Sequence, residues 1–132
     1  MHSDCYCTTL RAASRRLAAT YDAALLPLGL NVAQYALLRR VQKLETASLT
    51  QLGELLELDR STVGRNVRVL ERSGLLRMGR GEDQREATVA LTKRGTQTLA
   101  AAVPLWSECQ RELESRLGRE PLQMLRETLR AL

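Results

Sequence analysis

The sequence predicts a mainly helical chain that carries one small β-hairpin, and three segments support this fold class. Residues 49–58 repeat leucine at helical spacing, and residues 59–74 hold a second helix with a natural start and stop. Residues 75–91 contain two short strand-like runs on either side of a glycine-containing loop. This order predicts a winged helix-turn-helix, which we expect to be flanked by helices at both ends of the chain.

The first predicted helix covers about residues 8–26, and a shorter one covers residues 49–58. In the shorter helix, leucine at positions 49, 52, 55, 56 and 58 gives an amphipathic pattern. Asp59 follows directly, so only a tight turn separates this helix from the next. Two helices joined in this way form a helix-turn-helix.

The helix predicted over residues 60–72 has defined ends and two different faces. Asp59 is a natural N-cap, and the Ser73-Gly74 pair is a natural stop. Apolar residues at positions 63, 67 and 70 fall at spacings of four and three, so they share one face. The other face carries hydroxyls, an amide and arginines, which suit phosphates and base edges in a DNA major groove but also occur on solvated faces. These polar residues are Ser61, Thr62, Arg65, Asn66, Arg68 and Arg72.

Two runs of strand-forming residues, 75–78 and 87–91, flank the loop 79–86. This loop is longer than a two-residue hairpin turn and contains glycine, so it predicts a hairpin with a long tip, or wing. A long tip can reach a neighbouring DNA groove or the DNA backbone. Arg80 and Arg85 are placed in the loop to make such contacts.

The end of the chain is predicted to be helical from Thr92 to the C-terminus, with a break near residues 117–121. Beyond the break, leucine recurs at positions 122, 125, 129 and 132, which is helical spacing. A helix over residues 92–117 is long for a compact winged helix, so we expect a partner subunit to cover these apolar stripes. The alternative is that the stripes serve only the core of a single chain.

These residues resemble the MarR family of bacterial winged-helix transcription regulators. The motifs that carry the resemblance are Leu70–Arg77 after the second helix, Asp83–Arg85 in the wing and Leu91–Gly95 behind it. Residues 28–38 look like the family's junction between its first two helices, so the resemblance covers nearly the whole chain. One departure is Gly64, at a position where relatives often carry a small hydroxyl residue. A glycine within an exposed helix costs roughly 1 kcal/mol relative to alanine.

The resemblance implies a homodimer that binds double-stranded DNA at a pseudo-palindromic operator, usually as a repressor. Residues of about 1–30 and 96–132 would form the dimerisation helices, and residues of about 31–95 the winged helix-turn-helix DNA-binding unit. Arg85 would enter the minor groove, held by Asp83, while the start of the second helix would face the major groove. The expected DNA-binding residues are Arg60, Ser61, Thr62, Arg65, Asn66, Arg68, Arg80, Asp83 and Arg85.

Composition agrees with one folded domain and an acidic partner. A chain of 132 residues with 44% hydrophobic content is long enough for one core and short for two, so we expect a single domain over residues 1–132. The net charge is +5, and residues 59–95 alone hold nine basic and five acidic residues. No apolar run reaches the roughly 20 residues that span a bilayer, and no charged-then-apolar leader opens the chain, so a soluble cytoplasmic protein is expected.

The residues give less support to other functions. Catalysis is not expected, because the chain has one histidine, no glycine-rich phosphate loop and no pattern of two cysteines and two histidines. The main alternative is a winged-helix protein-interaction module that docks an acidic protein and has no specific DNA target. The long wing with Asp83 and Arg85 favours DNA, and a steep loss of binding with salt would separate the two hypotheses.

The cysteines form the first candidate effector site. Cys5 and Cys7 lie at the start of the first predicted helix, where the helix N-terminus favours a thiolate. Such thiols can oxidise, can pair with Cys109 of the same or the other subunit, or can hold a soft metal ion or an arsenical, with His2 as a further ligand. No cofactor is required. The alternative is that all three cysteines are small hydrophobic residues in a reducing compartment.

A small aromatic ligand is the second candidate effector, as the resemblance implies for many relatives. It would bind in the cleft between the dimerisation helices and the winged helix. Each tyrosine there can equally be a core residue or a helix–helix contact with a hydrogen-bonded hydroxyl. The candidate residues are Tyr21, Tyr35 and Trp106 as walls, and Arg11, Arg15 or Arg39 as partners of a ligand carboxylate.

Overall fold

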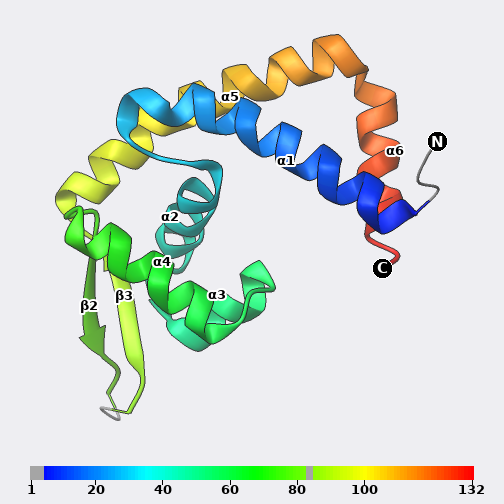
Figure 1. Ribbon diagram of the computed structural model, residues 1–132. Coiled ribbons are helices and arrows are strands. Elements are labelled where there is room, and N and C mark those ends of the chain that lie inside the picture. Colours follow the sequence, from blue (N-terminus) through cyan, green and yellow to red (C-terminus); the bar gives the residue numbers. More distant parts are fainter. Residues whose placement is uncertain (1–4, 83–84) are drawn as a thin grey trace.

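The computed structural model describes residues 5–82 and 85–132, and most of them lie in helices (Figure 1). In this part of the chain, no helix combines the length and the apolar character that a membrane crossing requires. The elements, in chain order, are α1 (Tyr6–Leu25), the 3-10 helix η1 (Leu26–Leu28), α2 (Val32–Leu44), β1 (Thr46–Ser48), α3 (Leu49–Leu56), α4 (Arg60–Arg72), β2 (Leu76–Arg80), β3 (Ala87–Leu91), α5 (Lys93–Leu117) and α6 (Arg119–Leu129).

The molecule has two parts, which Figure 1 shows one above the other. The helices α1 and α5 pack side by side in opposite directions, and α6 turns away from α5 at Gly118, whose φ is 92°. Below them, α2, α3 and α4 pack together, and the β2–β3 hairpin projects from this second part. The predicted fold class, a mainly helical winged helix-turn-helix with helices at both ends, is confirmed.

Three successive helices begin at a side chain that caps them. Asn31 and Gln34 each accept the other's backbone N–H, at 2.8 and 3.0 Å, at the start of α2. Ser48 and Gln51 form the same reciprocal pair at the start of α3, and Asp59 caps α4. Each cap satisfies backbone donors that a helix leaves unpaired, so the sequence fixes where these helices start.

The ends of the helix-turn-helix differ little from the predicted ones. The second helix covers residues 60–72, as predicted. The first ends at Leu56, because Glu57 adopts the left-handed conformation (φ 54°) and its N–H closes the last turn on the carbonyls of Glu54 and Gly53. A short turn, residues 57–59, therefore sets the two helices at an angle.

The sheet has one strand more than the predicted hairpin. Its order is β1-β3-β2, with both pairs antiparallel, and Ala47 of β1 lies opposite Val89 of β3. A strand of three residues is too short to show a period of two in the sequence, so it was not predicted. The strand β2 also extends to Arg80, opposite Ala87, so residues 79 and 80 belong to the strand and the predicted loop is shorter.

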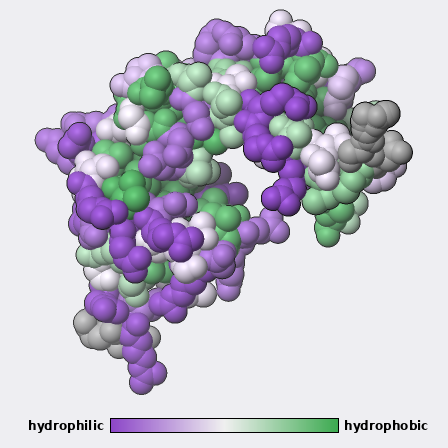
Figure 2. Space-filling model, viewed as in Figure 1, coloured by the Kyte–Doolittle hydropathy of each residue, from purple (hydrophilic) through white to green (hydrophobic). Residues whose placement is uncertain are grey.

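The core lies between the helix-turn-helix, the sheet and the first half of α5. The residues predicted to share one face of α4 are buried there, and Leu38, Leu52 and Leu99 pack against them with no exposed surface. By contrast, α6 has no buried residue, and Leu125 and Leu129 remain exposed. Figure 2 shows hydrophobic colour at the surface where α6 lies.

The start of α5 is bound to the turn between α4 and β2. The Thr92 hydroxyl donates to the carbonyl of Gly74 at 2.6 Å, and the Thr92 N–H donates to the carbonyl of Leu75 at 3.1 Å. The same hydroxyl oxygen accepts the N–H of Gly95 at 2.9 Å and so caps α5. One threonine therefore joins the end of α4, the wing and the long helix.

Candidate nucleic-acid interface

The first turn of α4 is organised by Asp59. One carboxylate oxygen accepts the Thr62 N–H and the Ser61 hydroxyl, each at 2.8 Å. The backbone hydrogen bond from Thr62 is the main cause that lowers the pKa of this carboxyl to about 2, with the Ser61 hydroxyl next. Because Asp59 uses the Ser61 proton, the Ser61 oxygen is left to accept a hydrogen bond.

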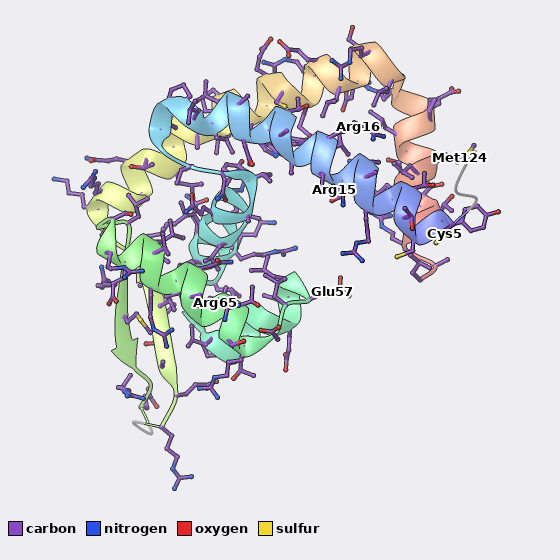
Figure 3. The ribbon with its side chains drawn as sticks, viewed as in Figure 1. Cys5, Arg15, Arg16, Glu57, Arg65 and Met124 are labelled. Atoms are coloured by element: carbon purple, nitrogen blue, oxygen red, sulfur yellow. The ribbon has the colours of Figure 1, made fainter. Side chains whose placement is uncertain are left out.

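A groove of about 610 Å³ runs between α4 and the wing. Four arginines line it, and among the described residues no acidic side chain does. Arg65 lies on the exposed face of α4 (Figure 3), and its guanidinium donates to the Thr62 hydroxyl oxygen at 3.3 Å. The lining residues are Leu49, Arg60, Ser61, Gly64, Arg65, Arg68, Met78, Arg80 and Ala87. A groove with this charge suits a polyanion.

Gly64 is buried, which corrects the expectation of a glycine within an exposed helix. A Cβ built on Gly64 would lie 3.8 Å from both terminal nitrogens of Arg68. The Arg68 guanidinium therefore lies over the glycine, four residues further along the same helix face. Because 3.8 Å is an ordinary contact distance, the structure leaves room for alanine at this position.

The wing supplies the other wall of the groove. Met78 and Arg80 are two residues apart on β2 and so point to the same side of the strand. Sequence reasoning missed Met78, because it assigned Arg80 to the loop and not to the strand that carries Met78. Arg85 is exposed beside the wing tip, where the Gly81 N–H donates to the Glu86 carbonyl at 2.9 Å. Asp83 lies outside the described residues.

The structure thus brings together part of the expected DNA-binding set. Thr62 and Asn66 are half-buried on α4 and do not line the groove, and Arg85 lies beyond it on the wing. The residues that share the groove are Arg60, Ser61, Arg65, Arg68 and Arg80.

The cysteines lie in two different environments. Cys5 is exposed at the N-cap of α1, and hydrogen bonds from the side chain and backbone of Thr8 lower the pKa of its thiol. Cys7 is exposed in the first turn. Cys109 is buried in α5, where burial raises the pKa of its thiol.

Cys109 is distant from Cys5 of the same chain. It lies near Tyr21, whose pKa is raised mainly by burial and also by this cysteine, and 16 residues of helix, roughly 24 Å, separate Tyr21 from Cys5. A disulfide needs Cα atoms within about 7 Å. The structure therefore does not bring these two cysteines together within one protomer. In the described chain, no group of three histidine, cysteine or acidic side chains is close enough to hold a metal ion.

The three aromatic residues predicted to line a ligand pocket do not lie together. The rings of Tyr35 and Trp106 stack with centroids 5.7 Å apart, and the Arg39 guanidinium lies 5.9 Å from the centre of the Tyr35 ring. All three residues line one pocket. Tyr21 is elsewhere, between α1 and α5, where its hydroxyl donates to the side-chain oxygen of Gln110. Arg11 and Arg15 are exposed on α1 and do not line this pocket.

The fold and the groove define a winged helix-turn-helix protein with a basic interface. The MarR family profile matches residues 28–86. The organic hydroperoxide resistance transcriptional regulator of Bacillus subtilis (strain 168) is 31% identical over 100 residues, which are 75% of this chain and 68% of that protein. The chain belongs to the MarR family, so the resemblance inferred from the sequence is confirmed.

Solved structures agree with this assignment. The transcriptional regulator MosR of M. tuberculosis, in complex with DNA, is 32% identical with a TM-score of 0.81, and the match covers 97% of this chain and 98% of that one. A probable transcriptional regulator from Pseudomonas aeruginosa is 27% identical with a TM-score of 0.86, over 97% and 96% of the two chains. These relatives are transcription regulators and not enzymes.

Proposed function

We propose that this protein is a homodimeric transcriptional repressor that binds double-stranded DNA through α4 and the wing. The observation that carries the proposal is the groove between them, lined by four arginines. A related regulator, MosR of M. tuberculosis, is described in complex with DNA. In this arrangement α4 enters the major groove, the wing arginines reach the backbone or the minor groove, and bound repressor blocks a promoter.

Within the groove, arginines have two different tasks. Arg65 is oriented by the Thr62 hydroxyl, so its guanidinium is held near the start of α4, where base edges are read. Arg60 on α4 and Arg80 on the wing line opposite walls of the groove and suit phosphates, which fix the position of the protein without reading sequence. Specificity and affinity are therefore assigned to different side chains.

A homodimer accounts for the apolar residues that the single chain leaves exposed. Leu10 and Leu17 on α1, and Leu125 and Leu129 on α6, are between 36% and 42% exposed, and Met124 is 67% exposed. A second copy that packs on these helices removes this surface from water. The two copies of α4 then lie about 34 Å apart, one helical turn of DNA, and the operator is pseudo-palindromic.

Salt dependence of DNA binding tests the proposal. Fluorescence anisotropy would measure the affinity for the DNA upstream of the protein's own gene, and for a scrambled duplex, between 50 and 200 mM salt. Release of about 0.9 counterions per neutralised phosphate gives a log–log slope near 7 if four arginines act in each protomer. Tight binding to the native duplex alone is the expected result. Absence of any specific binding would instead support the protein-interaction module.

Oxidation of Cys5 is the proposed signal that releases the repressor. The thiol is exposed and its pKa is lowered, whereas Cys109 is buried and its pKa is raised, so Cys5 is the more reactive of the two. A relative of the chain is named for organic hydroperoxide resistance. In the proposed step the Cys5 thiolate attacks a hydroperoxide oxygen. The S–O bond forms, the O–O bond breaks, and the alkoxide takes a proton and leaves as an alcohol, so sulfur becomes sulfenic acid.

The matched variants Cys5→Ser and Cys109→Ser test this signal. After treatment with cumene hydroperoxide, the wild type and Cys109→Ser are expected to lose DNA affinity at least tenfold, and dithiothreitol should restore it. Cys5→Ser is expected to keep its affinity. Loss of binding by Cys5→Ser under the same treatment would remove Cys5 from the mechanism.

A further inference from the structure

Helix α4 carries one apolar side chain on its otherwise polar exposed surface. Val69 is 41% exposed, whereas the other apolar side chains of this helix, Val63, Val67 and Leu70, are buried. Val69 is neither part of the hydrophobic core nor among the partly buried apolar residues that pack against it. The other exposed residues of α4 are Arg60, Ser61, Arg65, Arg68, Glu71 and Arg72. Packing within the chain therefore does not explain this valine.

Val69 lies one turn beyond Arg65 on the surface of α4. The two residues are four positions apart, so their side chains are neighbours on one face of the helix. On the other side of Arg65, the Thr62 hydroxyl oxygen accepts the Arg65 guanidinium at 3.3 Å, so the arginine is held at this face. A DNA major groove is about 12 Å wide, so a groove that receives Arg65 also receives Val69.

The major groove offers an apolar side chain one suitable partner, the 5-methyl group of thymine. The polar atoms at the base edges are hydrogen-bond donors and acceptors, which valine cannot pair with. A valine that covers such an atom removes water from it and gives no hydrogen bond in return, which is unfavourable. A valine against a thymine methyl group instead buries apolar surface on both partners. Val69 therefore suits thymine better than the other three bases.

We propose that Val69 contacts the 5-methyl group of a thymine in each half of the operator, an inference that rests on the proposed binding of DNA through α4. Four residues of helix rise about 6 Å and base pairs are about 3.4 Å apart, so this thymine lies about two base pairs from the base that Arg65 contacts. Arg65 suits guanine, whose two acceptors match a guanidinium. Together the two side chains select a guanine and a thymine at a fixed separation.

Uracil tests this contact, because it differs from thymine only in lacking the 5-methyl group. A series of duplexes would be made from the DNA upstream of the protein's own gene, each with uracil in place of thymine at one position of both half-sites. Fluorescence anisotropy of the reduced full-length protein would give the affinity for each duplex. At one position, uracil is expected to weaken binding about fourfold per half-site and so about fifteenfold for the two. Uracil outside the half-sites should have no effect.

Val69→Ala tests whether this side chain makes the contact. The variant should bind the thymine duplex about fifteenfold more weakly than the wild type does, and it should bind the thymine and uracil duplexes equally. Leu55→Ala is the matched control, because it removes an apolar side chain that is 44% exposed on α3. This control should keep the full difference between thymine and uracil. Both side chains are exposed, so the fold should tolerate either change.

The outcomes separate the thymine contact from the proposed function. If uracil has no effect on the wild type at any position, or if Val69→Ala keeps the full effect, the proposed contact is wrong. In both cases the wild type still binds the thymine duplex tightly and specifically, so the repressor function stands. If the wild type shows no specific binding to the thymine duplex, the repressor function is wrong and the thymine contact is wrong with it.

Discussion

Gly95 of α5 packs directly against the backbone carbonyl of Leu75. A Cβ built on Gly95 would lie 2.0 Å from the Leu75 carbonyl oxygen, a distance that no side chain can occupy. The contact lies beside the hydrogen bonds of Thr92, so the long helix and the wing meet with no space between them. Only glycine permits this approach.

Gly95→Ala should therefore destabilise the protein. The added methyl group must push backbone atoms apart, and overpacking of this kind costs about 1–3 kcal/mol or more. Urea unfolding would measure the loss as a lower midpoint. Gly64→Ala is the control within a helix, because a Cβ at this position makes only ordinary van der Waals contacts. Alanine favours the helix more than glycine does, so this variant should raise the free energy of unfolding by about 1 kcal/mol. Equal stability of Gly95→Ala and the wild type would show that the junction is looser than described.

Arg65→Ala should reduce discrimination between DNA sequences. A bidentate contact between arginine and guanine is worth about 1–3 kcal/mol of discrimination, so the native operator should lose affinity while scrambled DNA changes little. Anisotropy titrations with both duplexes measure the difference. Arg116→Ala, an exposed arginine on α5, is the control and should behave as the wild type. A uniform loss on both duplexes would instead assign Arg65 to a phosphate.

Wing variants should behave differently from Arg65→Ala. Arg80→Ala and Arg85→Ala are each expected to weaken binding to native and scrambled DNA alike, and each should lower the salt slope by about 2 because one phosphate contact is lost in each protomer. Both residues are exposed, so the thermal midpoint should stay unchanged. Unchanged binding by both variants would mean that the wing does not touch DNA.

The Asp59 cap predicts a loss of stability in acid. The pKa of this carboxyl is lowered from its ordinary value of 3.8 to about 2 in the folded state, so the unfolded chain binds its proton first. The stabilising effect is therefore complete above about pH 4 and is lost as the pH falls towards 2. Thermal unfolding between pH 5 and 2 would measure it, with Asp59→Asn as the comparison. Between pH 5 and 2, the thermal unfolding midpoint should fall less in Asp59→Asn than in the wild type. An equal fall would show that the Asp59 carboxyl does not contribute to the loss of stability in acid.

Cys5 should also be the first thiol to react with iodoacetamide. Hydrogen bonds from Thr8 lower the pKa of the Cys5 thiol. The rate at which iodoacetamide alkylates Cys5 should therefore begin to fall only at a lower pH than the rate for an ordinary cysteine. Burial raises the pKa of Cys109, so this thiol should react only on unfolding. Mass spectrometry of partly modified protein gives the order. Modification of Cys109 before Cys5 would contradict it.

Local signals account for the elements that the sequence predicted well. Helix α4 was predicted with its correct ends because Asp59 and the Ser73-Gly74 pair lie next to the residues they affect. The strand β1 was missed because its three residues become a strand only through pairing with β3, 40 to 44 residues further along the chain. A local sequence pattern does not indicate which distant strand a segment will pair with.

For the candidate sites too, features set by residues close in the sequence were predicted, and features set by distant contacts were not. One helix face placed Ser61, Arg65 and Arg68 together in advance, because they share α4, and the family resemblance added Arg60. The pocket at Trp106 required α2 and α5 to meet, so the sequence could not distinguish Tyr35 from Tyr21. The burial of Gly64 was also missed, because the sequence does not show that the Arg68 guanidinium lies over it.

The helix α5 runs without interruption for 25 residues, from the junction with the wing to the turn before α6. At 1.5 Å per residue it spans roughly 37 Å, with Pro104, which has no N–H to donate, inside it, and a tilt of about 3° over that whole length displaces one end by about 2 Å. At the Gly95 end no free space separates the two segments, because the carbonyl of Leu75 is already in contact with Gly95. A displacement of this end of α5 therefore also displaces Leu75. We therefore expect a small rotation among the helices far from the DNA groove to move the wing.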